Sequence, residues 1–253
     1  MWRVALQGAR FAVVGRAIEA IYDLVGGPGP RASAIARTRL IDDLIGQAAL
    51  TIDQLVILGA GYDTRAHRLD CLSDTTVYEI DHPDTQADKR SILAGVTTLA
   101  ARSLTFVSVD FERDDLANAL SASGYQRGKR TMFLWEGVTQ YLSSHAVDKT
   151  LSAIRQTACE GDSLVFTYVD DAALGGDISR FPEAARWMNG TAKRAEPWIF
   201  GLSPTDLPDY LRTRGFCLAS DLSTREAGRL YFRPLGRPDQ GSDLYHVTTA
   251  TIS

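Results

Sequence analysis

The fold is decided by the stretch QLVILGAGYDTRAHRL at residues 54–69. It starts with a short apolar run of the kind that forms a strand buried on both faces of a sheet. The glycine-rich segment GAGYD follows this run, and a helical pattern starts after it. A strand, a glycine turn and a helix in this order predict the first unit of an open α/β sheet, which binds its ligand beyond the carboxyl ends of the strands.

The downstream sequence repeats this alternation of β-rich runs and helical stretches. The β-rich runs lie at residues 76–80, 104–109, 131–135 and 163–169. The clearest helical stretch starts at Ser143 and stops at Gly161. Such alternation predicts a parallel sheet. Two last runs, 216–223 and 244–252, are separated by a long loop and are predicted to pair antiparallel at the sheet edge.

The chain is predicted to be a single domain over residues 1–253. Residues 1–50 have helical spacing, interrupted by glycines and prolines, and are predicted to form a helical cap. Residues 51–253 form the α/β core. Within the core, residues 171–201 carry four aromatic side chains. We expect this segment to be either a lid or wall over the ligand, or a peripheral helix that these side chains pack.

Composition excludes several classes of protein. The 27 basic residues are scattered and outnumbered by 31 acidic ones, which argues against a nucleic-acid partner. Apolar runs are too short for a membrane span or a signal peptide. The three cysteines, Cys71, Cys159 and Cys217, are far apart, which argues against a disulfide framework and predicts a reducing cytoplasm. The histidines are dispersed, so no metal site is expected.

Acidic residues follow each of the first five predicted strands. They are Asp63, Glu79, Asp81, Asp110, Glu136, Asp170 and Asp171. Any one of them could simply cap the next helix. Because the carboxyl ends of parallel strands meet at one edge, the set predicts a negative rim and a ligand that is cationic or rich in hydroxyl donors.

The spacing of these carboxylates favours one cofactor over another. Glu79 and Asp81 follow Gly59 by 20 and 22 residues, where a carboxylate binds ribose hydroxyls. The third glycine of a dinucleotide fingerprint is replaced by Thr64, and Asp63 precedes it. A pyrophosphate is disfavoured beside that carboxylate. S-adenosylmethionine fits better, because it has no phosphate and carries a sulfonium and an ammonium.

Several further segments, together with residues 54–69, resemble the leucine carboxyl methyltransferase family of class I S-adenosylmethionine-dependent methyltransferases. The segments are IARTRLIDDLI (35–45), VYEIDHPDTQADKR (77–90), FVSVDFERDD (106–115), WEGVTQYLS (135–143) and EPWIFGL (196–202). The resemblance covers most of the chain from residue 35. It implies a Rossmann-like class I methyltransferase fold, with a mostly parallel seven-stranded sheet and an antiparallel C-terminal edge. S-adenosylmethionine would be the cofactor and S-adenosylhomocysteine the product.

By matching position, the resemblance implies a set of cofactor-binding residues. They are Arg37, Gly59, Ala60, Gly61, Asp63, Asp81, Asp110, Phe111 and Glu136. In this assignment Arg37 grips the cofactor carboxylate, and the glycine turn lines the methionine part. Asp81 holds the ribose, with Glu79 as its rival. Asp110 and Phe111 receive the adenine, and Glu136 takes the ammonium.

The substrate side is implied less fully. Tyr141 is expected to face the transferred methyl, so Tyr141 and Arg37 are the predicted catalytic residues. Trp187 and Trp198 are predicted to line the acceptor together with Tyr141. The basic residue that longer family members place near the cofactor from their leading segment has no clear counterpart, although Arg3 or Arg10 could serve.

The predicted reaction is methyl transfer from sulfonium to oxygen. A carboxylate acceptor is already ionised at neutral pH and needs no general base. It could belong to a small polyketide-like acid or to a peptide C-terminus. A phenol or alcohol would need a base, for which His145 is the nearest candidate. A nicotinamide-dependent oxidoreductase and a non-catalytic cofactor-binding protein stay open as alternatives, and the oligomeric state is not predicted.

Overall fold

The computed structural model describes residues 29–95, 98–177, 179–192, 197–237 and 241–253. The first part of the predicted helical cap, with Arg3 and Arg10, lies outside these residues. The strands are β1 Gln54–Leu58, β2 Thr76–Asp81, β3 Ser103–Ser108, β4 Thr131–Trp135, β5 Ser163–Val169, β6 Phe216–Ser223 and β7 Tyr245–Ile252. They form one seven-stranded sheet in the order β3-β2-β1-β4-β5-β7-β6.

Pairing within the sheet follows the predicted pattern. The strands β1 to β5 pair in parallel. The strand β7 is antiparallel to both of its neighbours, β5 and β6. This confirms the Rossmann-like fold with its antiparallel C-terminal edge. Parallel strands point the same way, so the carboxyl ends of β1, β2 and β4 meet at one edge of the sheet.

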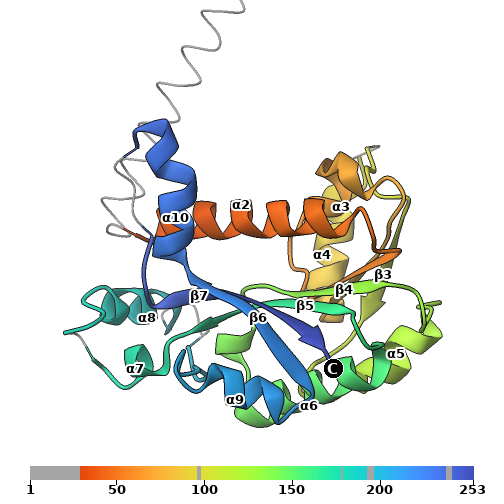
Figure 1. Cartoon of the computed structure of the whole chain (residues 1–253). Helices are drawn as coiled ribbons and strands as arrows, with labels where there is room; N and C mark the ends of the chain where they lie inside the picture. Colours follow the sequence, from red (N-terminus) through yellow and green to blue (C-terminus); the bar gives the residue numbers. More distant parts are fainter. Residues whose placement is uncertain (1–28, 96–97, 178, 193–196, 238–240) are drawn as a thin grey trace, which may run out of the picture.

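Helices cover both faces of the sheet. They are α2 Pro30–Ala48, α3 Arg65–Arg68, α4 Pro83–Leu93, α5 Leu116–Ala122, α6 Ser144–Thr157, α7 Asp171–Leu174, α8 Ala184–Ala192, α9 Leu207–Arg212 and α10 Thr224–Phe232. Short 3-10 turns are η1 Asp70–Leu72, η2 Thr139–Tyr141 and η3 Arg233–Leu235. In Figure 1, α2 and α10 lie above the sheet and α5, α6 and α9 lie below it. All five residues of β1 are therefore buried.

Each face has its own apolar core. On the α2 side, Ile41 and Ile45 pack with Leu55 and Ile57 of β1. On the other side, the alternate residues of β1 pack with the apolar face of α6, which includes Leu151. Because successive strand residues point to opposite faces, one continuous apolar strand serves both cores. The predicted helix after Ser143 is confirmed, but it ends at Thr157, before Gly161.

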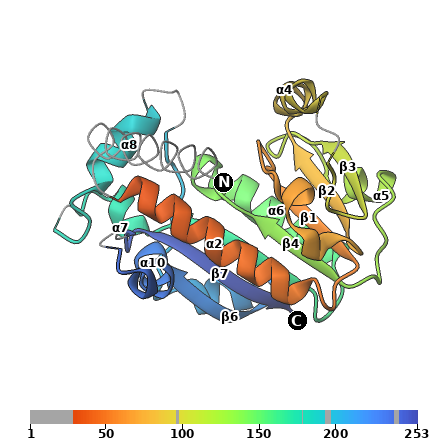
Figure 2. The same cartoon turned by 90° about the horizontal axis from the view of Figure 1, so that it is seen from above.

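The segment between β6 and β7 differs from the prediction. It was expected to be a long loop, but it contains α10, which packs beside α2 (Figure 2). The helix starts with a capping box: the Ser223 hydroxyl accepts from the Glu226 N–H, and the Glu226 carboxylate accepts from the Ser223 N–H. The S-x-x-E spacing that makes this box is visible in the sequence.

Residues 171–201 contain α7 and α8. A small third core joins this segment to the start of β7, and includes Phe181, Ala184 and Tyr245. A parallel bridge between Asp170 and Leu202 ties the two ends of the segment together. The segment is thus fastened at its base. A role for it as a lid stays a prediction.

Candidate active site

The turn between β1 and α3 depends on two glycines. Gly59 and Gly61 have φ values of 63° and 47°, a conformation that residues with a Cβ rarely adopt. A Cβ at Gly59 would also overlap the side chain of Val138, in the loop after β4. The backbone N–H of Gly61 donates to the carboxylate of Asp81 at the end of β2. The turn therefore holds the ends of three strands against one another.

A cavity of about 390 Å³ opens beside this turn, and we call it the glycine cavity. Its charged lining residues are Arg37, Asp63, Arg65, Arg68 and Glu136. Glu136 accepts hydrogen bonds from Arg37 Nε and from Arg65 Nη1, each at 2.6 Å. Arg65 Nη1 also donates to Asp63 at 2.5 Å, and Arg65 Nε donates to Asp42 of α2 at 2.7 Å. We call the five residues linked by these bonds the arginine cluster: Arg37, Asp42, Asp63, Arg65 and Glu136.

Charge pairing dominates the protonation of the arginine cluster. Burial alone would raise the pKa of Glu136, but the positive charges of Arg37 and Arg65 outweigh it and hold that pKa below its ordinary value. Burial also opposes the charge on Arg65, yet Glu136 and Asp63 raise its pKa. Arg37, Arg65 and Glu136 are therefore charged at neutral pH. The cavity presents separate positive and negative groups rather than an excess of either sign.

The predicted negative rim is wrong as a description of this edge. Asp63 and Glu136 lie at the cavity, but both are paired with arginine. Glu79 and Asp170 are buried, and they pair with Lys89 at 2.5 Å and Arg180 at 2.8 Å. The sequence pattern showed the carboxylates but not their counter-ions, which come from α3, α4 and more distant segments. The net charge of this edge therefore gives no reason to expect a cationic ligand.

The structure separates the two candidates for the ribose site. Glu79 is fully buried beside α4. Burial raises the pKa of Glu79, with Lys89 acting in the opposite direction. Asp81 lies at the open end of β2, half-buried, and accepts from the N–H groups of Gly61 and His82. Of the two carboxylates, only Asp81 is placed beside the glycine turn.

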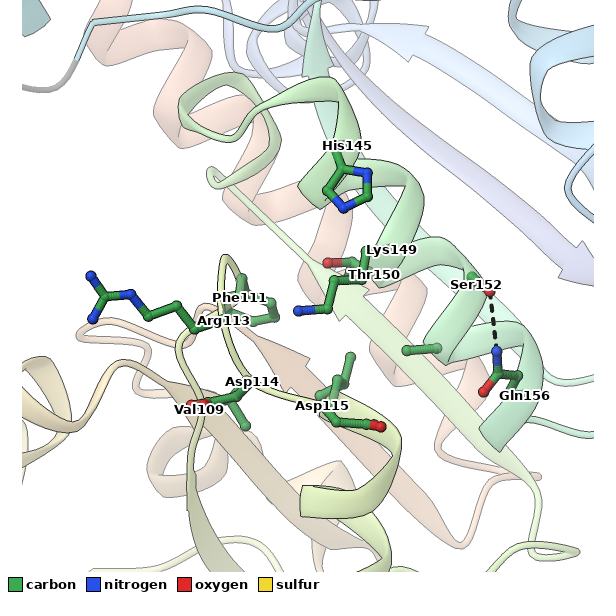
Figure 3. Close-up of a pocket in the computed structure, with 12 residues that line it drawn as sticks. Val109, Phe111, Arg113, Asp114, Asp115, His145, Lys149, Thr150, Ser152 and Gln156 are labelled. Atoms are coloured by element: carbon green, nitrogen blue, oxygen red, sulfur yellow. Dashed lines mark hydrogen bonds between the residues drawn. The ribbon is translucent and has the colours of Figure 1, made fainter.

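Phe111 lines a second cavity, of about 350 Å³, between the loop after β3 and α6. Figure 3 shows Lys149 extending from α6 toward this loop, with His145 near the start of the helix. We call this space the α6 cavity. Asp110 is half-buried beside it, and its carboxylate accepts from the Glu112 N–H at 3.0 Å. His145 thus belongs to the α6 cavity and not to the glycine cavity.

Trp187 and Trp198 are brought together, as the prediction of a shared acceptor wall requires. Their ring centroids lie 6.5 Å apart, edge to face. Trp198 meets the ring of Tyr245 in the same way, at 6.4 Å. The guanidinium of Arg37 lies 5.1 Å from the centre of the Tyr245 ring. Tyr245 therefore links the two tryptophans to the arginine cluster.

Tyr141 lies apart from both cavities. It ends η2, is half-buried, and lines neither the glycine cavity nor the α6 cavity. Sequence reasoning missed Arg65, Asp42 and Tyr245. Arg65 was detectable, because it follows the glycine turn directly in the quoted stretch. Asp42 and Tyr245 carry no local signal, since only the folded chain brings α2 and β7 to the glycine turn.

Two further observations concern the described residues only. Among them, no group of three or more histidine, cysteine or acidic side chains is arranged to hold a metal ion. Their helices include none with the length and apolar character needed to cross a membrane.

The sheet order, the antiparallel C-terminal edge and a glycine turn beside a carboxylate at the end of β2 define the class I methyltransferase fold. A model of the leucine carboxyl methyltransferase family matches residues 17–155. The chain belongs to this family, and S-adenosylmethionine is the cofactor that the family uses. The described residues suit its amino-acid end, because that end carries one positive and one negative group.

Relatives in actinobacteria support this membership. The chain is 34% identical over 228 residues to a protein of Mycolicibacterium smegmatis provisionally assigned as an S-adenosyl-L-methionine-dependent methyltransferase, covering 84% of this chain and 73% of that protein. Similarly assigned proteins of Mycolicibacterium gilvum and Mycobacterium avium are 36% identical, over 58% and 71% of this chain. The chain spans 49% and 58% of the lengths of these two relatives.

Solved structures agree on the fold. A methyltransferase-like protein of Thermobifida fusca superposes with a TM-score of 0.64 at 18% identity, covering 93% of this chain and 88% of that one. Magnesium protoporphyrin IX methyltransferase from Synechocystis, solved with bound S-adenosylhomocysteine, superposes with a TM-score of 0.51 at 11% identity, covering 99% and 100%. At these identities the likeness concerns the fold alone.

Proposed function

We propose that this chain is an S-adenosylmethionine-dependent O-methyltransferase that converts a carboxylate into its methyl ester. The observation that supports the proposal is the arginine cluster beside the glycine cavity. A cluster with separate positive and negative groups complements a zwitterion, and the amino-acid end of the cofactor is one. A diphosphate would need positive groups without the neighbouring carboxylates.

Each end of the cofactor has a candidate partner in the chain. Arg37 uses its Nε on Glu136, and in the described part of the chain its two terminal amino groups make no hydrogen bond, so they can take the cofactor carboxylate. Glu136 is placed to accept from the ammonium. Asp81 is our assignment for the ribose hydroxyls. Phe111 is our assignment for the adenine, beside the α6 cavity.

The glycine turn would line the methionine part of the cofactor. Gly59, Ala60 and Gly61 all border the glycine cavity. The missing Cβ atoms of the two glycines let a ligand approach the backbone closely. Asp63 is held by Arg65, so it would orient the cluster more than it would touch the ligand. We place Asp110 at the edge of the adenine site.

The bound cofactor supplies an activated methyl on its sulfonium. The chain would supply placement and exclusion of water, which account for much of the acceleration in such transfers. The acceptor would lie against Trp187 and Trp198, with Tyr141 facing the methyl. The residues that line the glycine cavity in the described part of the chain include no histidine, so this lining offers no imidazole as a general base. That absence favours an acceptor that is already ionised.

A binding and product assay tests the proposal. Isothermal titration should show S-adenosylhomocysteine binding and no binding of NAD. Incubation with S-adenosylmethionine and candidate acids, small apolar acids and peptides with free C-termini, should yield a product heavier by one methylene unit. Mild alkali should reverse this gain, because a methyl ester hydrolyses and a methyl ether does not. Binding of NAD without S-adenosylhomocysteine would favour an oxidoreductase, and an alkali-stable product would move the acceptor to a hydroxyl.

A further inference from the structure

Tyr245 occupies a position that neither the family model nor the glycine motif assigns. It is the first residue of β7, is 4% exposed, and lies beyond the residues 17–155 that match the family model. Register pairs it with Val169 at the end of β5. The antiparallel strand β7 thereby places one aromatic side chain at the end of the sheet where the carboxyl ends of the parallel strands meet.

The hydroxyl of Tyr245 is tied to the turn that follows Glu136. It lies 3.3 Å from Gln140 Nε2 and 3.3 Å from Thr167 Oγ1. Both partners also form a hydrogen bond with Gly137. Gln140 Nε2 donates to the Gly137 carbonyl at 3.2 Å, and the Gly137 N–H donates to Thr167 Oγ1 at 2.8 Å. The phenol therefore completes a set of hydrogen bonds around the residue next to Glu136.

The ring of Tyr245 acts on a second group of the glycine cavity. The Arg37 guanidinium lies over it at 5.1 Å from the ring centre, within the range of a cation–π contact. Among the described residues, Arg37 also forms an ion pair with Glu136, at 2.6 Å. The same ring meets Trp198 through its other contact. One side chain thus contacts the arginine, the turn and the aromatic wall.

We propose that Tyr245 is a positioning residue for the amino-acid end of the cofactor: its ring fixes Arg37, and its hydroxyl fixes the turn that carries Glu136. This inference rests on the proposed function, because it assumes that the glycine cavity takes a cofactor with a carboxylate and an ammonium. Tyr245 itself touches neither group. It acts by holding their partners at a fixed separation, and it joins that separation to the acceptor wall.

Two ligands distinguish this role from a general effect on the fold. S-adenosylhomocysteine has the amino-acid end, and 5′-methylthioadenosine lacks it while keeping the adenosine. Loss of one neutral hydrogen-bond set in Tyr245→Phe should weaken S-adenosylhomocysteine about threefold. Loss of the ring as well in Tyr245→Leu should weaken it about tenfold or more. The affinity for 5′-methylthioadenosine should stay within about twofold in both variants.

Tyr231 provides a matched control. It also contacts an arginine of α2, with the Arg39 guanidinium 6.0 Å from its ring centre, and its hydroxyl donates to Asp43 at 2.9 Å. It lies on α10 and borders neither cavity. If the loss in Tyr245→Leu came only from loosening α2, Tyr231→Leu would weaken S-adenosylhomocysteine as much. We expect that control to bind both ligands like the unchanged protein.

The outcomes separate the two proposals. Failure of the unchanged protein to bind S-adenosylhomocysteine overturns the proposed function, and the role of Tyr245 with it. Equal losses for the two ligands, or equal losses in Tyr231→Leu and Tyr245→Leu, overturn the role of Tyr245 alone. So does unchanged affinity in Tyr245→Leu or, should that variant not fold by circular dichroism, in Tyr245→Phe. Selective loss for S-adenosylhomocysteine supports the role.

Discussion

The sheet holds two charged networks, and they differ in what they leave available to a ligand. The arginine cluster lies beside the glycine cavity, at the carboxyl ends of the parallel strands. The other network, which we call the histidine network, joins Tyr168, Asp221, His246 and Thr248 across β5, β6 and β7. Both are largely buried and rich in short hydrogen bonds. The arginine cluster adjoins the glycine cavity, and the terminal amino groups of Arg37 make no hydrogen bond in the described part of the chain.

The histidine network is closed on itself. Asp221 accepts from the Tyr168 hydroxyl at 2.9 Å, from Thr248 at 2.6 Å and from His246 Nδ1 at 2.8 Å. The other ring nitrogen of His246 lies 2.9 Å from the Asp243 carbonyl. The ring also stacks on Tyr168, at 4.9 Å. A network with every polar atom used can stabilise the fold but has nothing left for a ligand.

This contrast teaches that pairing alone does not mark a site. Acidic residues at strand ends suggested a ligand in the sequence, yet Glu79 and Asp170 turned out to be internal pairs. A candidate site needs charged groups, an adjoining cavity and unused hydrogen-bonding capacity at the same place. The glycine cavity meets all three conditions.

Arg65 should be the residue whose loss costs the most stability. Its side chain is 4% exposed and pairs with Asp42, Asp63 and Glu136. Arg65→Met would leave Asp63 without this counter-ion and would leave Asp42 and Glu136 with one arginine each, Arg68 and Arg37. Removing one partner from a buried ion pair costs about 3–5 kcal/mol. Urea unfolding measures the change. Arg68→Met is the control, because Arg68 pairs with the same Asp42 from the surface, and should cost about 1 kcal/mol or less.

Equal costs for the two arginine variants would contradict the view that Arg65 is the centre of the arginine cluster. A further check is Arg65→Lys, which keeps the positive charge but loses the fork that reaches several partners at once. It should fall between the two. If it unfolds as easily as Arg65→Met, geometry rather than charge holds the cluster together.

Asp81 and Glu136 should govern cofactor binding, while the histidine network should not. Asp81→Ala and Glu136→Ala each remove charged hydrogen bonds to the ligand and should weaken S-adenosylhomocysteine by about 1–3 kcal/mol in isothermal titration. Asp221→Asn, in the closed network, should leave the affinity within about twofold. Unchanged binding in both site variants would remove the site assignment, and a loss in Asp221→Asn would end the contrast between the networks.

Glu79→Gln sharpens the same test within one strand. Glu79 lies two residues before Asp81 on β2, but it is buried against Lys89. The substitution should lower the free energy of unfolding and leave cofactor affinity unchanged. If it weakens S-adenosylhomocysteine as much as Asp81→Ala does, the ribose would have to be assigned to the buried carboxylate.

A smaller effect is expected where α10 covers the antiparallel edge. Ser223 caps this helix as part of its capping box. Ser223→Ala should lower the free energy of unfolding by about 1 kcal/mol, the usual cost of losing such a cap. Binding of S-adenosylhomocysteine should not change, because the cap lies away from the glycine cavity. If Ser223→Ala also weakened S-adenosylhomocysteine, then residues of the antiparallel strands other than Tyr245 would influence cofactor binding.

Most of the fold could be predicted from the sequence because its signals are local. The apolar run at residues 54–58 and the glycines after it specify a strand and a turn without reference to the rest of the chain. The helix α10 was missed although its nine residues have a clear amphipathic period and a capping box, which are both local signals. Its capping box was the better signal, because a cap depends on two residues and not on a face.

The site was only half predictable. Gly59, Gly61 and Glu136 lie beside the cavity, and their role in cofactor binding stays a prediction. The partners that decide the charge of the site come from α2 and β7, far away in the chain. A single sequence gives no sign that Asp42 faces Arg65, or that Tyr245 lies under Arg37. The net charge at the edge of the sheet could therefore not be predicted, because it depends on these tertiary contacts.

The histidine network should make stability depend on pH in one direction. Burial lowers the pKa of His246, but the hydrogen bond and charge of Asp221 outweigh burial, so the folded pKa lies above the ordinary value. Each ring nitrogen of His246 faces an oxygen that can only accept, from Asp221 or Asp243. Only the imidazolium can donate to both, because it carries a proton on each nitrogen. A raised folded pKa contributes stability that is complete below the unfolded value, about 6.5, and is lost as pH rises through the folded pKa.

Urea unfolding at steps between about pH 5.5 and 8.5 measures this loss, since that window spans the unfolded pKa and the values above it. Subtracting the same series for Asp221→Asn isolates the network, because the variant keeps a hydrogen-bond acceptor beside His246 but removes the charge that raises its pKa. The difference in unfolding free energy between the two proteins should shrink as the imidazolium loses its proton. A difference that is flat with pH would show that His246 is neutral when folded. Cofactor affinity should not follow the same curve, because no residue of the histidine network lines the glycine cavity in the described part of the chain.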